Sequence, residues 1–123
     1  MNALHPLHIF SATMLLALVS TPAATIRLDE LDLSAMSAGW GQARTNLSVT
    51  QKTLGIDGTK FERGVGTHAN SECVIALDGR AKVFSAKVGV DDNANSDKAS
   101  LEFAVFGDGR ELWTSGVCRW QQP

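Results

Sequence analysis

Apolar residues occupy every second position in two segments of the chain, residues 83–90 and residues 100–106. A period of two is typical of a half-buried β-strand. The inward-facing sets that it predicts are Phe84, Ala86, Val88 and Val90 in the first segment, and Leu101, Phe103 and Val105 in the second. The motif GDG at residues 107–109 then turns the chain into residues 110–114, which predicts a closing hairpin.

Shorter runs predict four further strands, separated by turns rich in Gly, Asn and Asp. They cover residues 26–31, 47–50, 59–62 and 72–77. No segment after Thr25 keeps a 3.6-residue period over three turns. Six or seven short strands at a spacing of about ten residues predict an all-β fold, an antiparallel sandwich or barrel.

The N-terminus carries an uncharged, apolar segment. The first 24 residues contain no Asp, Glu, Lys or Arg, and residues 9–19 are almost wholly apolar. A membrane-spanning helix needs about 20 such residues, so the segment fits a secretory signal peptide better. Small residues at Thr21 and Ala23 predict cleavage after Ala23, which leaves residues 24–123 as one secreted or periplasmic domain without a membrane span. The alternative is a buried helix or an uncleaved anchor.

Composition excludes several classes of function. With 44% hydrophobic and 20% charged residues, the chain can form a core, which argues against disorder and coiled coil. A net charge of -2 and the lack of a basic run argue against a nucleic-acid partner.

The sequence also lacks the spacing of known catalytic motifs. G-x-S-x-G, H-E-x-x-H and a phosphate loop are all missing, and two of the three histidines fall in the predicted signal peptide. We therefore expect no enzymatic activity. The remaining route to catalysis is a pair of carboxylates drawn from Glu62, Glu72, Asp91 and Asp92.

Five motifs follow one another along the chain: SAMSAGWG at 34–41, GIDG at 55–58, FERGVGTHANSE at 61–72, FSAKVGVDD at 84–92 and VFGDG at 105–109. In this order they resemble the NPCBM family of carbohydrate-binding modules, which are often attached to glycoside hydrolases. The resemblance covers residues 28–117. It implies a jelly-roll sandwich like that of galactose-binding domains, and a glycan ligand of which galactose-type sugars are one candidate.

The end of the chain departs from that family. After residue 117 the family continues with further strands and an acidic segment containing His and Trp, whereas this chain stops at Pro123. We therefore expect a C-terminally incomplete sandwich with an open edge, unless Trp120 covers that edge. The alternative functions are a protein-interaction or adhesion module and a truncated product without a ligand.

Sugars are recognised by an aromatic face that stacks on the ring and by polar groups that hold the hydroxyls. Trp40, between two glycines, is a candidate platform, although a lone Trp in a small domain more often packs inward. Residues 67–72 gather hydroxyl, imidazole, amide and carboxylate groups. We expect carbohydrate contact at Trp40, His68, Asn70 and Glu72, and the alternative for His68 and Asn70 is a structural turn.

The acidic loop at residues 91–97 is a candidate metal site. Oxygen-bearing side chains at Asp91, Asn93, Asn95 and Asp97, followed by Glu102, have the spacing of an EF-hand loop. Ser96 stands where that loop needs Gly, and strands flank it instead of helices. We expect either structural calcium at Asp91, Asp92 and Asp97 or a solvated turn.

The two cysteines leave two alternatives open. After export, Cys73 and Cys118 could form a disulfide. Otherwise they are small buried thiols that fill the core.

Overall fold

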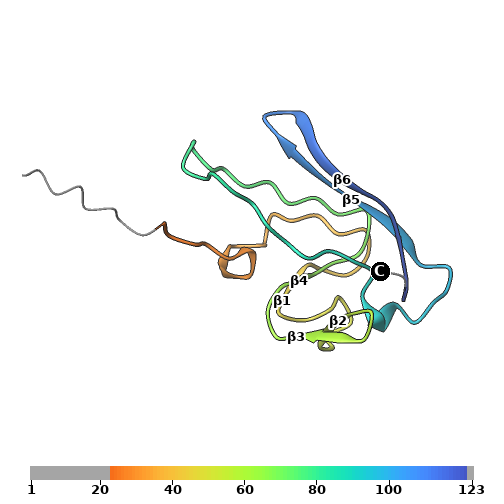
Figure 1. The fold of residues 1–123 in the computed structure, drawn as a ribbon. Helices are drawn as coiled ribbons and strands as arrows, with labels where there is room; N and C mark the ends of the chain where they lie inside the picture. The colour runs from red at the N-terminus through yellow and green to blue at the C-terminus, as the bar shows by residue number, and fades with distance from the viewer. Residues whose placement is uncertain (1–22, 122–123) are drawn as a thin grey trace, which may run out of the picture.

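The computed structural model describes residues 23–121, and its six strands pair antiparallel in three separate two-stranded ladders (Figure 1). β1 (Arg44–Thr45) pairs with β4 (Val65–Gly66), β2 (Leu54–Ile56) with β3 (Thr59–Phe61), and β5 (Ser100–Gly107) with β6 (Arg110–Arg119). Two 3-10 turns, η1 (Leu28–Glu30) and η2 (Asp92–Ala94), are the helical elements of this part of the chain. The all-β, antiparallel prediction is confirmed.

Residues 1–22, which hold nearly all of the predicted signal peptide, lie outside the described residues. Within residues 23–121, no helix has the length and apolar character that a membrane crossing requires.

The long hairpin of β5 and β6 follows the predicted alternation. Along β5, Leu101, Phe103 and Val105 are half-buried and the residues between them are exposed. Asp108 and Gly109 both have positive φ, 49° and 75°, which is the geometry of a tight two-residue hairpin turn. The hairpin prediction is confirmed, and β6 continues five residues beyond the predicted end.

The small core lies where β2 and β3 meet the chain that enters η2. Leu54 and Val90 are the buried hydrophobic side chains among the described residues, at 9% and 4% exposure. The η2 turn clamps this hairpin, because the Gly55 nitrogen donates to Asp91 Oδ2 at 3.2 Å and the Gly58 nitrogen donates to Asp92 Oδ2 at 3.1 Å.

Two of the short predicted strands are turns instead. Residues 26–31 contain η1, where Asp29 pairs with Arg27 of the same turn and Glu30 pairs with the distant Arg63. Residues 47–50 form a tight turn that the Gln51 nitrogen closes onto the Ser48 oxygen at 2.8 Å. The predicted strand at 59–62 is confirmed as β3.

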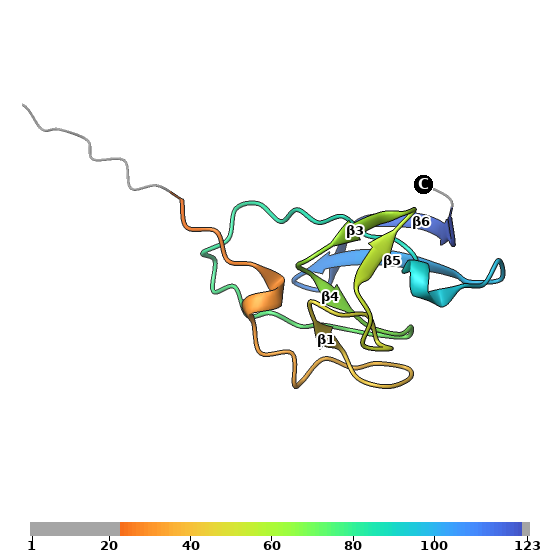
Figure 2. The same ribbon diagram turned by 90° about the horizontal axis from the view of Figure 1, so that it is seen from below.

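Residues 72–77 and 83–90 were predicted as strands, but they pair with no strand of the described chain. A turn at Asp78 and Gly79 joins them, and the segment runs as an irregular trace without strand arrows (Figure 2). Of the apolar set predicted to face inward in 83–90, Val90 is buried but Phe84 is 60% exposed. The alternation of apolar residues indicated an apolar face on these segments. Because β5 and β6 pair only with each other, no strand among residues 23–121 covers that face.

Candidate functional site

Trp40 and His68 lie side by side at the surface. Their ring centroids are 6.1 Å apart and the ring planes are inclined by 65°, an edge-to-face arrangement. Trp40 is 59% exposed, so the inward packing that we favoured for it is wrong.

The β1–β4 ladder brings these two loops together. Because Arg44 pairs with Gly66, the chain before β1 and the chain after β4 leave the same end of the ladder. They stay in contact beyond it: the Gly39 nitrogen donates to the His68 oxygen at 3.0 Å, and the Ser37 nitrogen donates to the Glu72 oxygen at 3.0 Å.

Gly39 allows the closest contact between the two loops. A Cβ atom at this position would lie 2.6 Å from the Asn70 nitrogen, nearer than side-chain carbons come to backbone. The glycine before Trp40 therefore lets its loop lie directly on the peptide between Ala69 and Asn70. The Trp40 ring that follows is exposed and lies beside His68.

The polar cluster at residues 67–72 divides into two groups. Thr67 and Ser71 serve the turn itself, because the Thr67 hydroxyl donates to Ser71 Oγ at 2.9 Å and the Ser71 hydroxyl donates to the Ser37 oxygen at 2.7 Å. His68, Asn70 and Glu72 are exposed. The side-chain hydrogen bonds of the turn thus come from Thr67 and Ser71, and sugar contact at His68, Asn70 and Glu72 stays a prediction.

The accessible group offers complementary hydrogen-bonding chemistry. His68 Nδ1 donates to the Ala69 carbonyl at 2.6 Å, so its Nε2 is left as an acceptor in the neutral ring. Within residues 23–121, the side chains of Asn70 and Glu72 make no hydrogen bond to the protein. An amide and a carboxylate therefore face solvent on the segment that carries His68.

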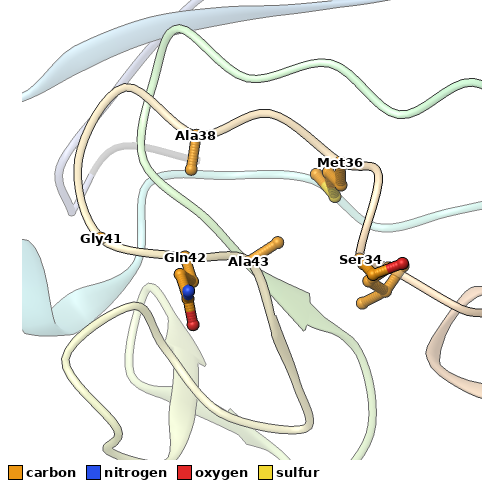
Figure 3. A pocket seen from close by; sticks show the side chains of 7 residues that line it. Ser34, Met36, Ala38, Gly41, Gln42 and Ala43 are labelled. Carbon is orange, nitrogen blue, oxygen red and sulfur yellow. The ribbon is translucent and has the colours of Figure 1, made fainter.

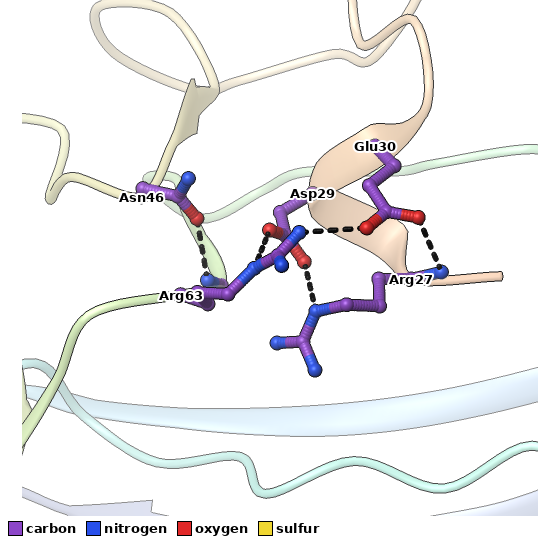
Figure 4. Close-up of polar contacts among 6 residues, drawn as sticks. Arg27, Asp29, Glu30, Asn46 and Arg63 are labelled. Carbon is purple, nitrogen blue, oxygen red and sulfur yellow. Dashed lines mark hydrogen bonds and ion pairs between the residues drawn. The ribbon is translucent and has the colours of Figure 1, made fainter. Parts of the chain in front are cut away.

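An ion-pair network that sequence analysis missed fixes the start of this segment (Figure 4). Arg63 Nε lies 2.8 Å from Asp29 Oδ2, and its Nη2 lies 2.7 Å from Glu30 Oε1. Arg27 Nε pairs with the other Asp29 oxygen at 3.0 Å. Gly64, which follows Arg63 in the chain, donates its backbone N–H to Asn46 Oδ1 at 2.9 Å. The network thus anchors the backbone that enters β4 and leads to His68.

Asp29 is 8% exposed, and the two arginines keep it ionised. Burial raises the pKa of this carboxyl, but hydrogen bonds from Arg63 and the backbone, with the charges of Arg27 and Arg63, hold the pKa below its usual value. The same hydrogen bonds raise the pKa of Arg63. No spacing rule links residues 34 positions apart, so no sequence signal pointed to the network.

The calcium expected at Asp91, Asp92 and Asp97 stays a prediction. Asp91 and Asp92 already accept backbone N–H groups, and Asp91 also caps η2 through the Asn93 nitrogen at 2.7 Å. Among residues 23–121, no three His, Cys, Asp or Glu side chains gather closely enough to hold a metal ion. Glu102 points outward, as expected, and bonds to Thr114 across the hairpin.

Cys73 and Cys118 are free and half-buried in the structure, which is closer to the expected core thiols than to a disulfide. Trp120 packs at the end of β6, where its indole nitrogen donates to the Asp92 oxygen at 3.2 Å.

The model of the NPCBM/NEW2 domain family matches residues 24–123. The chain belongs to this family. The resemblance inferred from the sequence motifs is confirmed.

One curated protein and two solved structures are similar to this NPCBM/NEW2 domain. It is 37% identical over 81 residues to alpha-1,3-galactosidase B of Akkermansia muciniphila, a match over 64% of this chain and 10% of that protein. The chain therefore spans about a tenth of the length of this curated relative.

Two solved structures share its fold. The first is the structure of CBM51 from Clostridium perfringens GH95 in complex with methyl-galactose, with a TM-score of 0.62, 28% identity, and coverage of 78% of this chain and 71% of that one. The second is the M60 catalytic domain with the CBM51-1 and CBM51-2 domains from Clostridium perfringens ZmpB, with a TM-score of 0.64, 25% identity, and coverage of 82% and 11%.

Proposed function

We propose that this NPCBM/NEW2 domain is a non-catalytic carbohydrate-binding module for galactose-type sugars. In this role it holds an attached or associated glycoside hydrolase close to its glycan. The observation that carries the proposal is the exposed Trp40 ring beside His68, with Asn70 and Glu72 on the same segment as that imidazole. The methyl-galactose complex of the similar CBM51 structure supports the choice of sugar.

The chemistry of the four side chains suits a hexose. One face of a galactose ring presents mainly C–H groups, which stack on an indole such as that of Trp40. The Asn70 amide both donates and accepts, whereas the Glu72 carboxylate and His68 Nε2 accept hydrogen bonds from hydroxyl groups. Few polar contacts and one open stacking face favour weak, reversible binding.

An open surface also favours binding over turnover. Trp40, His68, Asn70 and Glu72 are all exposed, and Glu72 is the one carboxylate among them, whereas glycoside hydrolysis commonly uses two carboxyl groups that flank the scissile bond. We propose that the domain acts outside the cytoplasm, in line with the apolar segment at residues 9–19.

A second candidate function is protein interaction or adhesion. It is favoured by apolar side chains that remain in solvent, among them Val74 at 85% and Val83 at 84% exposure. A glycan array separates the two functions, because an adhesion module of this kind would bind no sugar on it.

The test of sugar binding is calorimetric titration of the purified chain with methyl-galactoside. Trp40→Ala should weaken binding by at least about ten-fold, since loss of a central aromatic contact commonly costs 2 kcal/mol or more. Trp113→Ala is the matched control, because Trp113 is also exposed, at 47%, but lies on β6. Equal affinity in both variants would remove Trp40 from the site.

A further inference from the structure

A pocket of about 450 Å³ opens inside the loop that carries Trp40 (Figure 3). Its apolar lining is Leu33, Met36, Ala38 and Ala43, and its polar side chains are Ser34 and Gln42. The volume lies in the range of small-ligand sites, which is about 300–1,000 Å³. In Figure 3 the side chains of Ala38 and Ala43 both point into the space that the loop encloses.

The lining selects a neutral group with an apolar part. No side chain that lines the pocket is charged, so an anionic sugar would find no partner there. Four apolar side chains suit a methyl group. The Gln42 amide has one acceptor and two donors, so it can donate to the carbonyl of another amide or accept from its N–H.

Local hydrogen bonds hold one wall of the pocket in place. The Ser34 nitrogen donates to Asp32 Oδ1 at 2.9 Å, and the Met36 nitrogen donates to the Leu33 oxygen at 3.0 Å. The wall is therefore a closed turn before any ligand arrives.

Gly41 connects the pocket with Trp40. It lines the pocket and directly follows Trp40 in the chain, with φ at +67°. A Cβ atom at Gly41 would lie 2.8 Å from Val49 Cγ2, so the position excludes a side chain. Gly41, which has no side chain, is thus the residue that joins Trp40 to the pocket lining.

We propose that this pocket is a second sugar subsite, which takes the acetamido group of an N-acetylhexosamine joined to the galactose on Trp40. The inference rests on the proposed function and names the neighbouring sugar. The acetamido methyl packs between Met36, Ala38 and Ala43. Its amide forms one hydrogen bond with Gln42, through either the acetamido carbonyl or the acetamido N–H.

Two pairs of disaccharides test the subsite. Galactose linked to N-acetylglucosamine is compared with galactose linked to glucose, once with the 1→4 and once with the 1→3 linkage. The members of a pair differ only in the acetamido group. We expect the N-acetylated member of at least one pair to bind about three- to ten-fold more tightly, the worth of one hydrogen bond.

Variants then test whether the difference in affinity between the two disaccharides of a pair arises in the pocket. Gln42→Leu should make the members of that pair bind equally, and it should leave the affinity for methyl-galactoside unchanged. Thr59→Val, at an exposed position on β3, is the matched control and should keep the preference. If Gln42→Leu does not fold, NMR of the wild-type chain remains: the Met36 methyl resonance should shift with the N-acetylated disaccharide and not with its partner.

Failure of the subsite and failure of the proposed function give different results. Binding of methyl-galactoside without a preference in either pair overturns the subsite alone. Absence of methyl-galactoside binding overturns both. A preference that survives Gln42→Leu, with no shift of the Met36 methyl, also overturns the subsite.

Discussion

The edge of one ring in the Trp40–His68 pair meets the face of the other, with the centroids 6.1 Å apart, and both side chains stay exposed. Neither residue is near the other in the sequence. Their contact therefore reports whether the loop before β1 and the loop after β4 are docked.

The pair should be energetically coupled. Aromatic pairs contribute about 0.5–1.5 kcal/mol beyond area burial, and exposure should put this one at the lower end. A double-mutant cycle with Trp40→Ala and His68→Ala, measured by denaturant unfolding, should give a coupling of about 0.5 kcal/mol. The same cycle with Trp113→Ala and His68→Ala should be additive. Additivity in both cycles would contradict the observed contact.

Gly39→Ala should separate the two loops. The new Cβ would overlap the peptide between Ala69 and Asn70, so the backbone must move, at a cost of about 1–3 kcal/mol in unfolding free energy. Affinity for methyl-galactoside should fall together with stability. Gly58→Ala is the control: it strains a backbone with φ at +76° but meets no atom within 4 Å, so it should lower stability and leave affinity intact.

Asp29 should make stability depend on pH in the acid range. Its pKa is lower in the folded chain than the ordinary 3.8, so the carboxylate stabilises the fold above that pH. The stabilisation should be lost as pH falls through the folded-state value. The difference in unfolding free energy between the wild type and Asp29→Asn should thus be largest near neutral pH and shrink below pH 3.8. A constant difference from pH 7 to pH 2.5 would contradict the role of the ion pairs.

Asp91→Ala should destabilise the fold by about 1–3 kcal/mol. It removes the cap of η2 and leaves the buried Gly55 nitrogen without its acceptor. Asp97→Ala, an exposed position in the same loop, should change the unfolding free energy by no more than about 0.5 kcal/mol. Equal effects of the two variants would mean that the Asp91 contacts contribute nothing.

Calcium removal tests the remaining prediction for this loop. We expect the η2 turn to persist in EDTA, because backbone N–H groups already occupy oxygens of Asp91 and Asp92. Melting curves with millimolar calcium and with EDTA should then coincide. A calcium-dependent rise in Tm that Asp97→Asn abolishes would instead confirm the metal site predicted from the sequence.

The alternation of apolar residues was sufficient to predict β5, since side chains of a strand alternate whatever its partner is. The same signal at residues 83–90 misplaced Phe84, which is 60% exposed, because a periodic pattern identifies an apolar face and not the surface that covers it. Strands of two residues, such as β1 and β4, are too short to show any period.

The sequence suggested members for the candidate site, which stay a prediction, but it did not indicate their geometry. Residue chemistry and the order of the family motifs selected Trp40, His68, Asn70 and Glu72. The contact of Gly39 with a peptide 30 positions away is tertiary, so no local pattern encodes it. The pairing of Asp29 with Arg63 is likewise a tertiary contact between separate turns.

The backbone contact at Gly39 also bears on the thermodynamics of recognition. Since the Trp40 and His68 loops are already held together, a ligand has no need to order one against the other. Little conformational entropy should then be lost on association. Even a shallow surface with a handful of contacts could in this way retain measurable affinity for a single monosaccharide.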